Sequence, residues 1–265
     1  MLTKLLKYDM KKMFKFLSVF FILALFFSVL ARVFSEIGDS LFCSILSSVA
    51  SGTAISMMFS ILINCLMRTW VTFRSNFYGD ESYLTHTLPV SRSTLYLSKS
   101  ITAYTAMLTS FAVILASVSI IYLNKETALI LKSFLKPITA FFEVDIYLFV
   151  FVLLLILFLE FVSVLQWGFM GIILGHRLSS QKILFSVLIG FLLYIVSQGT
   201  VLLVMLFSAL VSPGFMEIFT SNDLFAMEPS VAKGIVLIAT LCYLLFAVLG
   251  QLFNIRLFEK GVDVE

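Results

Sequence analysis

The segment Ile146–Leu174 reads IYLFVFVLLLILFLEFVSVLQWGFMGIIL and contains one charged side chain, that of Glu160. Roughly 20 consecutive apolar residues are enough for a helix to cross the hydrocarbon core of a bilayer. The apolar residues here follow one another without the alternation of period two that a membrane β-barrel requires. The segment therefore predicts a transmembrane helix.

Five other segments have the same character. They are Leu17–Phe34, Leu41–Met67, Ile101–Leu123, Ile183–Leu210 and Val231–Asn254. The chain of 265 residues is 61% hydrophobic and 12% charged, whereas soluble domains are about 25% charged. We therefore expect an all-α membrane protein with six transmembrane helices, organised as a single transmembrane domain over residues 1–265.

The distribution of basic residues predicts the orientation of the chain. Of the 18 Lys and Arg residues, thirteen fall in four segments on one side, which are residues 1–16, 68–100, 175–182 and 255–265. Cytoplasmic segments carry the excess of Lys and Arg in membrane proteins. We therefore expect a multi-pass protein of the cell membrane with both termini in the cytoplasm.

Residues 1–16 have a helical pattern of their own. Leu2, Leu6, Met10 and Met13 recur on one face, and lysines recur on the other. This pattern is typical of a basic amphipathic helix in the inner headgroup layer, and we expect the chain to turn after it into the first span. The alternative is that these lysines are ordinary residues flanking the span.

The connection over residues 68–100 is the longest cytoplasmic one between spans. Gly79 is expected to end the preceding helix, and Asp80 to cap a short new helix with Glu81 in its first turn. Pro89 disfavours helix in the residue before it, and Ser91 can cap the helix that enters the third span. The sequence thus predicts a short helix across the cytoplasmic face.

Two segments on the opposite side also carry patterns. Residues 124–145 combine apolar side chains with Lys132 and Lys136 and predict an amphipathic helix on the outer surface. In residues 211–230, Pro213 and Gly214 are expected to end the fifth span. The apolar residues that follow them suggest a short helix that dips back into the membrane, which requires shelter for its backbone.

Polar residues inside the spans are candidates for function. Glu160 lies near the middle of its span with Gln166 on roughly the same side, and an ionisable group at that depth is by default a functional candidate. The alternative is a protonated or hydrogen-bonded glutamate that joins two helices. Gly171 and Gly175 have the G-x-x-x-G spacing of a close helix contact. The serine-rich second span favours packing or, alternatively, a polar path.

The sequence lacks the common motifs of enzymes. It has no phosphate-binding G-x-x-x-x-G-K-[ST] loop, no nucleophile elbow and no H-E-x-x-H. His86 and His176 are far apart and are expected to be solvated, and the three cysteines lie in separate spans as small apolar residues. We expect no catalytic, metal or cofactor site on this chain and no nucleic-acid partner.

The residues from Phe77 to Lys99 read FYGDESYLTHTLPVSRSTLYLSK. They resemble the second-connection signature of permeases of the bacterial type 2 ABC exporter family. The matching positions are Asp80, Glu81, Tyr83, Leu84, Leu88, Pro89, Val90, Ser91, Arg92, Leu97, Ser98 and Lys99. Ser82 stands where the family pattern has glycine. The six-span layout agrees with this family over the whole length of the chain.

The resemblance implies a permease that works as a homo- or heterodimer and is driven by a separate ABC ATPase subunit, which holds ATP and Mg²⁺. It also implies that the short cytoplasmic helix and its flanks dock on that ATPase. The docking residues would be Asp80, Glu81, Tyr83, Leu84, Pro89 and Arg92. The alternative is a secondary transporter that uses Glu160 as a proton or ion relay, although inverted repeats are not evident. The residues do not indicate the substrate.

Overall fold

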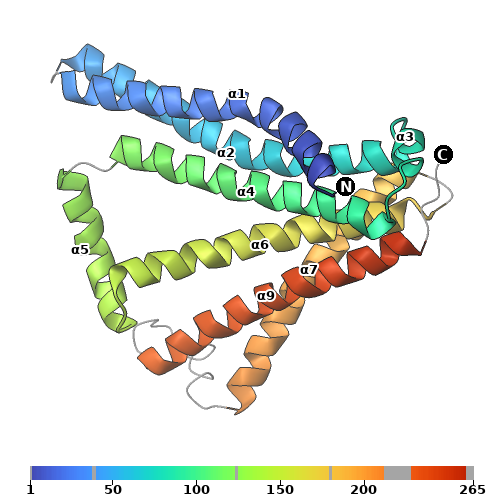
Figure 1. Cartoon of the computed structure of the whole chain (residues 1–265). Helices are drawn as coiled ribbons and strands as arrows, with labels where there is room; N and C mark the ends of the chain where they lie inside the picture. The colour runs from blue at the N-terminus through green and yellow to red at the C-terminus, as the bar shows by residue number, and fades with distance from the viewer. Residues whose placement is uncertain (1, 38–39, 123–124, 179–180, 212–227, 261–265) are drawn as a thin grey trace. The chain divides into compact units, whose positions relative to one another are not determined.

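The computed structural model of the chain describes residues 2–37, 40–122, 125–178, 181–211 and 228–260. All regular structure in these ranges is α-helical (Figure 1). The helices are α1 (Leu2–Ile37), α2 (Leu41–Tyr78), α3 (Ser82–His86), α4 (Arg92–Tyr122), α5 (Lys125–Phe141), α6 (Ile146–Gly175), α7 (Lys182–Val211) and α9 (Pro229–Glu259). Six of them are long and apolar enough to cross a membrane, which confirms the predicted all-α membrane class.

The six predicted spans correspond to α1, α2, α4, α6, α7 and α9. The prediction of a turn between an interfacial helix over residues 1–16 and the first span is wrong, because α1 is continuous from Leu2 to Ile37. Residues 14–18 contain no glycine or proline that would interrupt the backbone hydrogen bonds of the helix. The basic segment is therefore the first part of a long helix.

The connection between α2 and α4 contains the predicted short helix, with one correction. The helix α3 begins at Ser82 and its N-cap is Glu81, which makes no side-chain capping bond, so the prediction of Asp80 as the cap is wrong. Gly79 is the C-cap of α2, as predicted. The hydroxyl of Ser91 accepts the Thr94 N–H at 3.4 Å at the start of α4, which confirms that cap.

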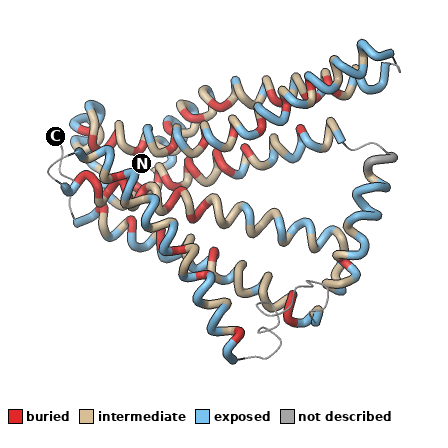
Figure 2. The backbone as a smooth tube through the Cα atoms, turned by 180° about the vertical axis from the view of Figure 1, so that it is seen from behind, coloured by how far each residue is buried: buried red, intermediate tan, exposed pale blue. Residues whose placement is uncertain are grey.

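The contacts of the chain define two compact units. Unit 1 comprises Met1–Ala128 and Phe258–Glu265, and unit 2 comprises Leu129–Leu257. In unit 1, α1 packs along both α2 and α4. Buried residues of this unit are most frequent in the last part of α2 and in the first half of α4, and buried positions occur along each of these helices (Figure 2). A single domain over residues 1–265 stays a prediction.

In unit 2, α6 packs closely along α7. A Cβ atom on Gly171 would lie 2.5 Å from the carbonyl oxygen of Ser186, and one on Gly175 would lie 2.5 Å from Cα of Ser186. These distances leave no space for a side chain, which confirms the predicted helix contact. The turn after α6 buries His176, whose Nδ1 lies 2.9 Å from the Ile172 carbonyl oxygen, so the prediction of a solvated residue there is wrong.

The structure describes part of the two segments that the sequence predicts on the outer side. The predicted helix in residues 124–145 is α5 (Lys125–Phe141), and Leu129, Ile130 and Phe134 on it are exposed. The proposed membrane-dipping helix in residues 211–230 lies largely outside the described residues. The side chain of Asp145 caps α6 by accepting the Tyr147 N–H at 3.2 Å.

Candidate functional site

The short helix α3 is fixed to the rest of unit 1 by a polar network. The network consists of Asp9 and Lys12 from α1, Asn76 from α2, Glu81 before α3, and Lys99 from α4. Lys99 Nζ lies 2.6 Å from Asp9 Oδ1, and Lys12 Nζ lies 3.2 Å from Glu81 Oε1. We call these five residues the α3 anchor network.

Asn76 connects the two ion pairs of the anchor network. In the amide orientation that satisfies its neighbours, Nδ2 donates to Glu81 Oε2 at 2.5 Å and to the Thr72 carbonyl oxygen at 3.1 Å. In the same orientation Oδ1 accepts a hydrogen bond from Lys99 Nζ. Asn76 is buried, so the start of α3 is tied through α2 to both α1 and α4.

An aromatic cluster lies beside this network in unit 1. Phe73, Phe77, Tyr96 and Phe258 are fully buried, and the ring centroids of Phe77 and Phe258 are 4.6 Å apart. His86 closes the end of α3 against this cluster, with Nε2 3.3 Å from the Phe77 carbonyl oxygen. The cluster and the network together hold both ends of α3 on α2.

The remaining face of α3 is exposed and apolar. Tyr83 is 65% exposed and Leu84 is 76% exposed. Asp80, Leu88 and Pro89 are exposed as well. The structure thus places the predicted docking residues in two groups, because Glu81 belongs to the anchor network while Tyr83 and Leu84 are exposed. Arg92 is exposed and donates from Nη1 to the Glu259 carbonyl oxygen at 3.4 Å.

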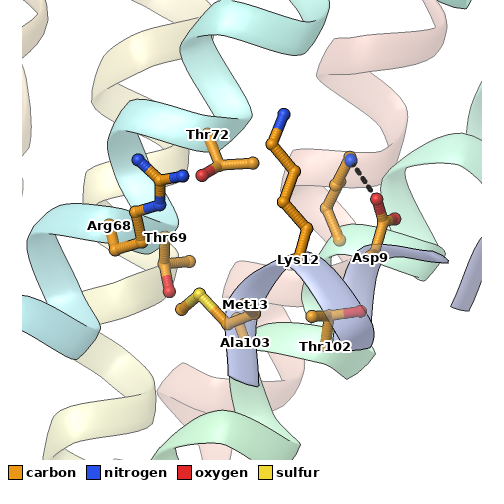
Figure 3. Close-up of a pocket in the computed structure, with 9 residues that line it drawn as sticks. Asp9, Lys12, Met13, Arg68, Thr69, Thr72, Thr102 and Ala103 are labelled. Atoms are coloured by element: carbon orange, nitrogen blue, oxygen red, sulfur yellow. Dashed lines mark hydrogen bonds and ion pairs between the residues drawn. The ribbon is translucent and has the colours of Figure 1, made fainter. Parts of the chain in front are cut away.

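A small cavity lies next to the anchor network in unit 1 (Figure 3). Its volume is about 30 Å³ and it is partly open. Residues from α1, α2 and α4 line it, among them Arg68, Thr72 and Thr102. The guanidinium of Arg68 lies 4.9 Å from the centroid of the Phe16 ring.

The polar residues predicted inside the fourth span lie in unit 2, apart from each other. Glu160 is half-buried and accepts a hydrogen bond from the Tyr194 hydroxyl at 3.5 Å. Gln166 is fully buried, and its Nε2 donates to Gln251 Oε1 at 2.7 Å. Its Oε1 accepts from Asn254 Nδ2, also at 2.7 Å. Each of these residues therefore joins α6 to a neighbouring helix.

Most of the serine hydroxyls of the second span form hydrogen bonds within α2 itself. The hydroxyls of Ser48, Ser56 and Ser60 donate to backbone carbonyls one turn earlier in the same helix. Ser47 instead donates to the Ala31 carbonyl oxygen of α1 at 2.9 Å. Among the described residues, the hydrogen bond from Ser47 to α1 supports helix packing, and not a polar path, for this part of the second span.

Sequence reasoning missed Asp9, Asn76 and Lys99 as parts of a site. Asp9 could have been noticed in the sequence, because it is an acidic residue in an otherwise basic segment.

In the ranges that the structure describes, no group of three His, Cys, Asp or Glu side chains is arranged to hold a metal ion. Comparisons of the chain with protein-family models, curated proteins and solved structures find no match.

Proposed function

We propose that this chain is the membrane-spanning permease subunit of an ATP-driven exporter of the type 2 ABC family, and that α3 docks on a separate ATPase subunit. The observation that carries the proposal is the exposed Tyr83–Leu84 pair on a short helix that is fixed at its base. An aromatic and an aliphatic side chain exposed together are typical anchors of a protein interface.

The anchor network supports a role in transmitting force. A docking helix that moved freely would absorb the motion of its partner. Here α3 is tied to α1 through Lys12 and to α2 through Asn76, and Asn76 also contacts Lys99 of α4. Displacement of α3 by an ATPase would therefore be passed to three candidate membrane-spanning helices at once.

The positions of the basic connections agree with the predicted orientation of the chain, in which both termini lie in the cytoplasm. In unit 1, the lysine-rich start of α1 contacts the α2–α4 connection through Lys12 and Glu81. In unit 2, Arg177 of the α6–α7 turn donates to the Leu257 carbonyl oxygen near the end of α9. Each unit thus brings basic segments together at one end, as the cytoplasmic placement of both termini requires.

The proposal further includes a second permease chain, because the family works as a pair. The transported substrate would cross between the two chains, while ATP and Mg²⁺ would be held by the ATPase and not by this chain. The secondary-transporter alternative depends on Glu160. The hydrogen bond from Tyr194 is one that a structural glutamate would make, so this observation does not favour a relay.

The test is co-expression of the full chain with the Walker-type ATPase expected from the neighbouring reading frame. Leu84→Asp should abolish co-purification of the ATPase and ATP-dependent transport, because it places a charge in the centre of the docking face. The matched control is Leu178→Asp in the other cytoplasmic connection, where the leucine is also exposed. Absence of such an ATPase, or equal binding by both variants, would overturn the proposal.

A further inference from the structure

The helix α5 has two chemically different faces. Its large apolar side chains recur every three or four residues along one side, and they are Ile130, Leu131, Phe134, Leu135, Ile138 and Phe141. Lys132 and Lys136 lie one turn apart on the opposite side, which also carries Leu129. This separation of apolar from basic residues is the pattern of a helix that lies in the plane of a membrane surface.

The middle of the apolar face is exposed. Ile130 is 65% exposed and Phe134 is 66% exposed. Lys132 and Lys136 are exposed as well, and no carboxylate of the described residues forms an ion pair with either of them. Exposed apolar patches of this kind mark sites of interaction with a protein or a membrane. The helix therefore calls for a partner that is both apolar and anionic.

Short connections hold α5 at the level where its neighbours leave the membrane. Two residues separate it from α4, which ends at Tyr122, and four separate it from α6, which begins at Ile146. Since an extended chain spans at most about 3.6 Å per residue, α5 begins within about 11 Å of the end of α4. Tyr122 and Tyr147 are exposed, and tyrosine is enriched where spans meet the headgroups. Because α4 and α6 are both candidate membrane-spanning helices, α5 is confined to the headgroup region.

The end of α5 shows which way its apolar face is turned. Phe141, on that face, packs against Val231 and Ala232 in the first turn of α9. The ring of the next residue, Phe142, lies 5.5 Å from the ring of Phe149 in the first turn of α6, measured between centroids. In unit 2, α5 runs across the start of α6 and not along it (Figure 1). The apolar face is therefore turned toward the membrane-spanning helices of unit 2, and the lysines are turned away from them.

We propose that α5 binds the bilayer surface, with its apolar face among the acyl chains and with Lys132 and Lys136 at the phosphates of anionic phospholipids. Burial of Phe134 and its neighbours in the bilayer removes apolar surface from water. The long stems of the two lysines allow their ammonium groups to stay at the level of the headgroups. Basic side chains at this level favour anionic over zwitterionic lipids. A soluble partner would have to reach a face that is turned toward the membrane, so this orientation favours lipid.

The depth of the apolar face is tested with a nitroxide label on a single cysteine, in the full chain without its native cysteines, in nanodiscs. Phe134→Cys labels the apolar face. Leu129→Cys is the matched control, because Leu129 is 67% exposed but lies on the lysine side. The ratio of collisions with oxygen to collisions with a water-soluble nickel chelate should be severalfold higher at position 134. Equal ratios would overturn the proposal. A label at position 134 that neither reagent reaches would also overturn it, and would assign the face to a second protein surface.

Hydrogen exchange at the amides of residues 130–136 tests the two lysines in the chain with its native cysteines. Phosphatidylglycerol mixed into phosphatidylcholine nanodiscs should slow this exchange about fivefold or more, which corresponds to about one lysine at an anionic surface. The double variant Lys132→Gln, Lys136→Gln should lose this difference. The control Lys11→Gln, Lys15→Gln removes the same charge from exposed positions of α1 and should keep it. A difference that is absent from the wild type, or that persists in the α5 variant, would overturn the proposal.

Discussion

Lys99 Nζ lies 2.6 Å from Asp9 Oδ1, and Asp9 Oδ2 accepts a hydrogen bond from the Ser98 hydroxyl at 2.8 Å. The side chains of Lys99 and Asp9 are only 12% and 8% exposed. This buried pair joins α1 to α4 in unit 1. Lys99 neutralises the Asp9 carboxylate, because a charge buried among packed helices without a partner would destabilise the folded state.

Breaking this pair on one side should destabilise unit 1 strongly. Asp9→Leu leaves the Lys99 ammonium buried without its carboxylate, and we expect a loss of about 3–5 kcal/mol in the free energy of unfolding. The double variant Asp9→Leu, Lys99→Leu should recover much of this loss, because no charge then remains unpaired. The free energy of unfolding of the single and of the double variant is measured by denaturant unfolding in detergent. Lys11→Leu, at an exposed position of α1, is the control, and a single variant as stable as this control would contradict the prediction.

The pair Lys12–Glu81 should affect the position of α3 more than overall stability. Both side chains are partly exposed, and such pairs contribute about 0.2–1 kcal/mol. Glu81→Lys should increase hydrogen exchange at the α3 amides of Thr85 and Thr87 while global unfolding changes little. The charge-swapped variant Lys12→Glu, Glu81→Lys should restore protection. Protection that is equal in all three proteins would show that this pair does not hold α3.

Gly171 should be intolerant of even one methyl group. In Gly171→Ala the added Cβ would lie 2.5 Å from the Ser186 carbonyl oxygen and 2.7 Å from the Gly190 nitrogen, so α6 and α7 must separate. We expect a lower Tm and poorer assembly. This loss should exceed the stabilisation of about 1 kcal/mol that replacing glycine with alanine brings within a helix. The control is Gly199→Ala on α7, where nothing lies within 4 Å of the added atom. Equal Tm values for the two variants would exclude the close contact.

Glu160 should act as a structural residue. Glu160→Gln keeps an acceptor for the Tyr194 hydroxyl and removes titration, so transport should be retained. Glu160→Leu removes the acceptor and should lower stability or assembly, and Tyr194→Phe should have a similar but smaller effect. Transport and Tm are measured on the same preparations. A well-assembled Glu160→Gln variant without transport at any pH would instead favour the secondary-transporter alternative.

The connection between α5 and α6 should respond to acid. Glu143 Oε2 lies 2.8 Å from Lys233 Nζ, and this hydrogen bond and charge hold the pKa of the Glu143 carboxyl below its ordinary value. Because the pKa is lowered in the folded state, the contact stabilises the fold above the ordinary pKa of about 4.3. It is lost as the pH falls through the lowered value. Titration by NMR should show this lowered pKa, and Lys233→Gln should return it to the ordinary value. An ordinary pKa in the wild type would contradict the contact.

The sequence by itself determined the class of this protein. The length and hydropathy of a span are local properties, and they are sufficient because only helices and closed barrels can satisfy the backbone inside a membrane. The contact at Gly171 and Gly175 was also predictable, since small residues at a spacing of four allow helices to approach closely. Gly79 and Ser91 act within their own turns, so their effects on α2 and α4 could be predicted as well.

Only the tertiary structure decided which polar side chains meet. Asp9 and Lys99 are far apart in sequence, and their contact depends on how α1 and α4 pack and rotate against each other. Glu81 shows the same dependence. The loop sequence groups it with Tyr83 and Leu84, whereas packing turns its carboxylate toward Lys12 and Asn76 and leaves the other two side chains exposed. Helix periodicity determines which residues share a face, but the neighbour that a face meets depends on the folding of the whole unit.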